Sequence, residues 1–138
     1  MLGFPSELPI PKNEGDFEKM CAEIYGVVFG DPLPNMNGRK GQEQTGVDVY
    51  VTHKGVGKIG VQCKKYYKTK LKWAHVEEEV RKADDGKQPI ARLLIATTTP
   101  SDAALQEKVQ KLSGERVAKD MFDVSVDFWE DIETRVSS

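Results

Sequence analysis

Three side chains near the middle of the chain have the types and spacing needed for phosphate chemistry. Asp48 lies in a segment of alternating apolar and polar residues, and Gln62 and Lys64 lie two apart in the next such segment. Residues of one parity on a strand face the same side. A hairpin of the two segments can therefore gather one carboxylate, one amide and one ammonium around a single point. Such a group can hold a divalent cation and position a water molecule against a phosphodiester.

The candidate metal ligands are all oxygen atoms. Asp48 offers a carboxylate, while the side chain of Gln62 and the backbone carbonyl of Cys63 offer neutral oxygens. Mg²⁺ prefers oxygen ligands in near-octahedral geometry and keeps several waters. Lys64 could align the attacking water or stabilise the charge that grows on the phosphate. We therefore expect a Mg²⁺ site, which Mn²⁺ could also occupy, with Lys64 beside it.

A further carboxylate for this site is expected from the first helix. We predict that helix over residues 16–29, because apolar residues recur there at helical spacing, namely Phe17, Cys21, Ile24 and Val28. Glu18 lies at the rim of this apolar stripe and Glu23 lies on the opposite flank. We favour Glu18 as the additional acid, while an exposed helix glutamate is the ordinary alternative for either residue.

The other elements that must position these residues follow from periodicity and from turn residues. Strands are predicted over 47–52, 58–65, 90–97 and 121–128, and helices over 73–85, from an N-cap at Ser101, and over 129–136. In the first strand we expect Val47, Val49 and Val51 to share one face. The order α-β-β-α-β-α-β-α predicts an α/β fold with a mixed central sheet flanked by helices.

A run of lysines follows the first candidate residue. Between Asp48 and Glu77 the chain has no acidic residue and seven lysines, while the rest holds 13 basic and 22 acidic residues. The run could contact nucleic-acid phosphates, with Tyr66, Tyr67 and Trp73 available to stack on bases. The alternative is a solvated edge of the sheet. The candidate contacts in or near this run are Lys65, Lys68, Lys70 and Lys72, with Arg39, Lys40 and Gln44 from the preceding loop.

Length and composition set the broad class. The 138 residues, 38% of them hydrophobic and 30% charged, fit one globular domain. No apolar run approaches the roughly 20 residues of a membrane span, and residues 1–11 lack the features of a secretory signal. Cys21 and Cys63 are too few for a disulfide framework, so we expect two buried thiols in a reducing compartment. A cytoplasmic location is expected.

Several segments of the chain resemble a known family of nucleases. Asp48 with Gln62-Cys63-Lys64 resembles the PD-(D/E)xK nuclease core, in the Mrr-like variant where Gln replaces the second acid. Residues 38–48 resemble the G-R-x-G-x-x-Q-x-G-x-D segment of Mrr-like effector nucleases in prokaryotic defence proteins. Two shorter segments resemble the first helix and the end of such modules, namely Asp16–Glu18 and Asp127–Ile132. The resemblance covers nearly the whole chain, and its central motif is moderately specific.

The resemblance implies a restriction-endonuclease-like core and Mg²⁺-dependent cleavage of DNA phosphodiester bonds. It also implies that residues 1–138 form one domain, the N-terminal effector of a longer anti-phage defence protein with a sensor or NTPase module. A homodimer or higher oligomer would suit double-strand cleavage. The alternative is a nuclease-fold module that binds nucleic acid or a protein without cutting, because the net charge is −2 and only Asp48 is a certain carboxylate.

Overall fold

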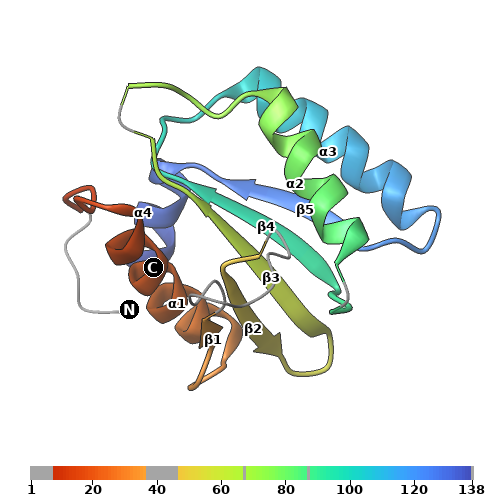
Figure 1. The fold of residues 1–138 in the computed structure, drawn as a ribbon, viewed down its shortest axis with the longest axis horizontal. Coiled ribbons are helices and arrows are strands. Elements are labelled where there is room, and N and C mark those ends of the chain that lie inside the picture. The colour runs from red at the N-terminus through yellow and green to blue at the C-terminus, as the bar shows by residue number, and fades with distance from the viewer. Residues whose placement is uncertain (1–7, 37–46, 67, 87, 138) are drawn as a thin grey trace.

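Helices cover both faces of a mixed β-sheet in this protein (Figure 1). The structure is a computed structural model, and it describes residues 8–36, 47–66, 68–86 and 88–137. Within these residues the elements are α1 (Glu14–Phe29), β1 (Asn35–Met36), β2 (Val49–His53), β3 (Gly57–Lys64), α2 (Trp73–Asp85), β4 (Arg92–Thr97), α3 (Ala103–Val117), β5 (Asp123–Asp127) and α4 (Trp129–Ser137). The predicted α/β order is confirmed, with the short strand β1 in addition.

The strands lie in the order β1-β2-β3-β4-β5. β1, β2 and β3 pair antiparallel, whereas β3, β4 and β5 pair parallel. Parallel neighbours need a crossover connection, which α2 supplies between β3 and β4 and α3 supplies between β4 and β5. The three parallel strands therefore end at one edge of the sheet, where Lys64 of β3 faces Thr97 of β4.

Two hydrophobic layers form, one on each face of the sheet. α1 and α4 cover one face, and α2 and α3 cover the other (Figure 1). β4 contributes to both layers, since Leu94 and Ala96 pack with α1 and α4 while Leu93 and Ile95 pack with α2 and α3. The continuous apolar run over 90–97 predicted such a strand, buried on both faces.

Helix α1 has a well-defined beginning and end. The side chain of Asn13 accepts a hydrogen bond from the N–H of Asp16, and Gly30 ends the helix in the left-handed conformation at φ 76°. Phe17 and Cys21 are fully buried on the predicted stripe. The helix begins at Glu14, two residues earlier than predicted, because Asn13 is its N-cap.

A buried polar cluster joins α1 and α4 to the end of β5. The Tyr25 hydroxyl donates to a carboxylate oxygen of Asp127 at 2.6 Å, and the Arg135 guanidinium pairs with the same carboxylate. Tyr25 is completely buried. Burial and the nearby Asp127 charge raise the pKa of Tyr25 well above its usual value, so this hydroxyl stays a proton donor. The cluster fixes the helix that carries Glu18 relative to the sheet.

The start of α3 differs from the expectation. The N-cap of α3 is Asp102, whose side chain accepts the N–H of Leu105, so the expected cap at Ser101 is wrong by one residue. The N–H of Ser101 donates instead to the carboxylate of Glu130. In the described part of the chain, no helix combines the length and apolar character that a membrane crossing requires.

Candidate active site at the end of the parallel strands

Asp48 lies in a β-bulge at the start of β2. Val49 faces Val61 across the ladder, and the N–H of Asp48 donates to the carbonyl of Val61 at 2.9 Å. Two residues therefore oppose one, an arrangement that turns a side chain away from simple alternation. The expected common face for Val47, Val49 and Val51 is accordingly wrong: Val47 packs in the α2/α3 layer, whereas Val49 and Val51 pack in the α1/α4 layer.

The bulge leaves the Asp48 carboxylate where β2 has stopped pairing with β3. Its Oδ2 accepts the N–H of Cys63 at 2.7 Å. In a regular ladder, a backbone carbonyl of the neighbouring strand would accept this N–H. Burial raises the pKa of Asp48. The hydrogen bond from Cys63 and the charge of Lys64 lower it, and the charges of Glu79 and Glu14 raise it, so that the net pKa lies above the usual value.

Gln62 and Lys64 point from β3 toward the α2 side of the sheet. The ammonium of Lys64 lies 2.8 Å from Oε2 of Glu79 on α2. Gln62 lies two residues away on the same strand, so its side chain points to the same face. The side-chain oxygen of Gln62 is buried and has no hydrogen-bond partner among the described residues. Cys63 points the other way and packs against the α1/α4 layer, with Cys21 as its side-chain partner.

Glu79 is a site residue that the sequence analysis missed. It is only 2% exposed, and it lies within the buried stripe of α2 formed by Val76, Val80 and Ala83. Its Oε2 also lies 3.7 Å from the ammonium of Lys82. The signal was present in the sequence, because a glutamate three residues after Val76 and one before Val80 falls on the apolar face of the helix.

The acids of α1 approach Asp48 from the opposite layer. Burial, the charge of Asp48 and then the charge of Glu14 raise the pKa of Glu18, so these three carboxylates are electrostatic neighbours. Glu18 is half-buried and Glu14 is exposed. Glu14 and Glu18 share a helix face at a spacing of four residues. Glu14 was missed because the helix was predicted to begin after it.

Charged and aromatic side chains surround the segment between β3 and α2. Lys65 is half-exposed, and Lys68, Lys70 and Lys72 are exposed. A groove of about 230 Å³ runs along Lys70 to Trp73 and the start of α3, where Lys108 places its ammonium 5.8 Å from the Trp73 ring centroid. The other predicted nucleic-acid contacts, namely Arg39, Lys40 and Gln44, lie outside the described residues.

Comparison with known proteins places the chain in a family. A family profile described as restriction endonuclease, of the Mrr type, matches residues 20–136. The chain belongs to this family. The matched region includes Asp48, Gln62, Lys64 and Glu79 and begins after Glu18. No curated protein and no solved structure matches the chain.

The donor set of this Mrr-type restriction endonuclease domain suits a hard cation. Among the described residues no group of three or more His, Cys, Asp or Glu side chains is arranged to hold a metal ion. The candidate ligands are the carboxylates of Asp48 and Glu18 together with neutral oxygens, completed by water, as Mg²⁺ accepts. The buried side-chain oxygen of Gln62, which lacks a partner in the described structure, is available for such a role.

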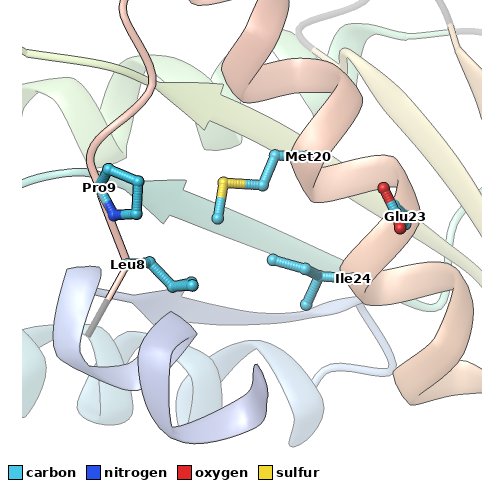
Figure 2. Close-up of a pocket in the computed structure, with 5 residues that line it drawn as sticks. All are labelled: Leu8, Pro9, Met20, Glu23 and Ile24. Carbon is cyan, nitrogen blue, oxygen red and sulfur yellow. The ribbon is translucent and has the colours of Figure 1, made fainter. Parts of the chain in front are cut away.

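Glu23 lies beside a pocket elsewhere on the restriction endonuclease domain. The pocket has a volume of about 280 Å³. Leu8, Pro9, Met20 and Ile24 line it, with Glu23 at its side (Figure 2). Glu23 is exposed, whereas Glu18 is half-buried and the charge of Asp48 raises its pKa. Of the two helix acids considered from the sequence, Glu18 is therefore the one that the fold brings to Asp48.

Proposed function

We propose that this domain hydrolyses DNA phosphodiester bonds with the help of Mg²⁺. The observation that carries the proposal is the position of Asp48, at the edge where β2 stops pairing with β3. Glu18 approaches that carboxylate from the α1 layer, and Lys64 approaches it from the α2 layer. At this edge a metal held by Asp48 and the Lys64 cation beside it can meet the same phosphate.

Each side chain has a defined part in this proposal. Asp48, Gln62, the Cys63 carbonyl and Glu18 would hold Mg²⁺, or Mn²⁺ in its place. The bound metal supplies Lewis-acid stabilisation of the phosphate and a water molecule of lowered pKa. Burial alone lowers the pKa of Lys64, but the hydrogen bond and charge of Glu79 outweigh it and leave the pKa raised. Lys64 is therefore protonated at neutral pH and stabilises negative charge as a cation.

The nucleic-acid backbone would follow the lysine segment after β3. The Thr98 hydroxyl accepts the N–H of Tyr66 at 3.0 Å, and the N–H of Thr98 donates to the carbonyl of Lys64, so this segment starts from a fixed position. We propose that Lys65, Lys68, Lys70 and Lys72 contact phosphates, together with Arg39, Lys40 and Gln44. Trp73 and Lys108 border the groove at the far end of that path.

The biological setting follows from the family resemblance. We propose that the domain is the N-terminal effector of a longer cytoplasmic protein of prokaryotic anti-phage defence, whose sensor or NTPase module selects the target. Pairing of two domains would supply the two sites that a double-strand break needs. The match over residues 20–136 and the fold support the nuclease part of this proposal.

A plasmid-nicking assay tests the activity. Wild-type protein is incubated with supercoiled plasmid in Mg²⁺, in Mn²⁺ and in EDTA, and Asp48→Ala is compared with the exposed-acid control Glu23→Ala. We expect metal-dependent nicking by wild type and by Glu23→Ala, and none by Asp48→Ala. A folded wild-type protein that binds DNA but cuts with neither metal would favour the non-cleaving module instead.

A further inference from the structure

Glu79 occupies a position where a carboxylate is energetically unfavourable. It is 2% exposed and lies among the apolar residues of α2, while the preceding residue of the helix, Glu78, is exposed and pairs with Arg81 at the surface. A buried ion loses its hydration, and packing by an apolar side chain of similar volume is often as stable or more stable. Stability of α2 alone therefore does not explain a glutamate at this position.

The contacts of Glu79 are incomplete in the described structure. Oε2 faces the ammonium of Lys64 at 2.8 Å and that of Lys82 at 3.7 Å, whereas the buried Oε1 has no hydrogen-bond partner among the described residues. Since nearly all buried polar atoms of proteins are paired, a half-satisfied buried carboxylate calls for an explanation beyond packing. The nearest group on which it can act is Lys64.

Lys64 needs an orienting partner. A lysine ammonium ends a flexible four-carbon stem and has no preferred direction of its own. Its backbone carbonyl is held by the N–H of Thr98, its side chain is 26% exposed, and the Glu79 contact comes from a rigid helix. Both ends of the lysine are thus fixed beside Asp48, whose charge in turn acts on Lys64.

Building on the proposed nuclease function, we propose that Glu79 is a positioning residue that holds the Lys64 ammonium in its productive direction at the phosphate. Glu79 then acts on the phosphate through Lys64 and contacts neither metal nor DNA. This sets it apart from Asp48 and Glu18, which would act on the metal. It also sets it apart from the lysines of the β3–α2 segment, which would act on binding.

The first test separates positioning from binding. Glu79→Gln keeps the shape of the side chain, and Glu78→Gln is the matched control on the same helix. Metal-free DNA affinity, the Mg²⁺ concentration for half-maximal rate and the single-turnover rate are measured for each. We expect Glu79→Gln to lower only the rate, by about 10- to 100-fold as for other residues that orient a reacting group, and Glu78→Gln to change nothing. A wild-type rate, or a raised Mg²⁺ requirement, would overturn the proposal.

The second test is a double-mutant cycle with Lys64. If Glu79 acts through Lys64 alone, Lys64→Ala and Lys64→Ala/Glu79→Gln should cleave at the same residual rate. A further rate loss in the double variant would show a separate role for Glu79 and overturn the proposal. Should Glu79→Gln fail to fold, Glu79→Asp takes its place in both tests, because it keeps the charge but moves the carboxylate back by one methylene.

A readout without catalysis distinguishes this inference from the proposed function. The ammonium protons of Lys64 can be observed by NMR of the metal-free protein, and a fixed ammonium exchanges its protons with water more slowly than a free one. We expect this signal in wild type and in Glu78→Gln, and its loss in Glu79→Gln. A protein that cuts no DNA but shows this pattern would retain the positioning role while the nuclease proposal fails. An unchanged signal in Glu79→Gln would overturn the positioning role itself.

Discussion

The Asp48 carboxylate has a structural role as a hydrogen-bond acceptor for β3 and a proposed chemical role as a metal ligand. One oxygen completes the hydrogen bonding of β3 by accepting the N–H of Cys63, and the residue is partly buried. The net result is a pKa above the usual carboxylate value. Without a bound metal, the ionised form is therefore less stable in the folded protein than in the unfolded chain.

Replacing Asp48 by Asn tests this interpretation. The amide oxygen can still accept the Cys63 N–H, and the unfavourable buried charge is removed. An acid whose folded pKa is raised loses stability as the pH rises through that pKa, so Asp48→Asn should be at least as stable as wild type near neutral pH. The difference should vanish in acid, where Asp48 is protonated. Thermal unfolding across pH measures this, and a variant less stable than wild type at neutral pH would contradict it.

Gln62 should behave as a weak neutral ligand. Gln62→Glu supplies a carboxylate at the same place, so it should keep cleavage or lower the Mg²⁺ concentration required, whereas Gln62→Ala should raise that requirement. A titration of cleavage rate against Mg²⁺ for the three proteins provides the measurement. If Gln62→Ala matches wild type at every metal concentration, Gln62 is not a ligand.

At the scale of elements, only one flank of α1 brings acidic side chains close to Asp48. Glu18 neighbours Asp48, while Glu23 lies by the apolar pocket of Figure 2. Glu18→Ala should therefore reduce single-turnover cleavage more than Glu23→Ala does, and Glu14→Ala should have an intermediate effect through its charge. Equal losses for Glu18→Ala and Glu23→Ala would mean that α1 supplies no ligand.

The β3–α2 segment should control binding, and the end of β3 should control chemistry. Lys64→Ala should lower the saturated cleavage rate by about 10²–10³, the usual cost of one oriented charge. Replacing Lys68, Lys70 and Lys72 together by Ala should weaken binding and reduce the salt dependence by about one unit of slope for each phosphate that is no longer neutralised. Affinity against salt, followed by single-turnover rates, separates the two. Unchanged binding by the triple variant would place the DNA path elsewhere.

Local sequence patterns predicted the elements better than the details of the site. The apolar run of β4 and the alternation of β3 and β5 depend on neighbouring residues, and these strands were confirmed. The bulge at Asp48 depends on Val61 and Cys63 across the hairpin, and the segment around it alternates in sequence without interruption. Glu79 was missed because its significance comes from Lys64, on a different element. Contacts between elements, unlike periodicity, leave little trace in local sequence.

At the scale of the whole molecule, the candidate site joins two separate hydrophobic layers. The helix with Glu18 packs in one layer, and the helix with Glu79 packs in the other, with the sheet between them (Figure 1). Neither layer alone contains both the acids and the oriented lysine. Correct docking of both layers is therefore a condition for cleavage.

This division has a consequence for local unfolding. Layers of a domain can open separately, with free energies below that of global unfolding. A ligand that requires a docked layer stabilises that layer against opening. Mg²⁺ alone should then slow amide hydrogen exchange mainly in α1, whereas Mg²⁺ with an uncleavable DNA should slow it in α1 and α2 together. The amides of α1 and α2 would thus report which half of the site has been filled.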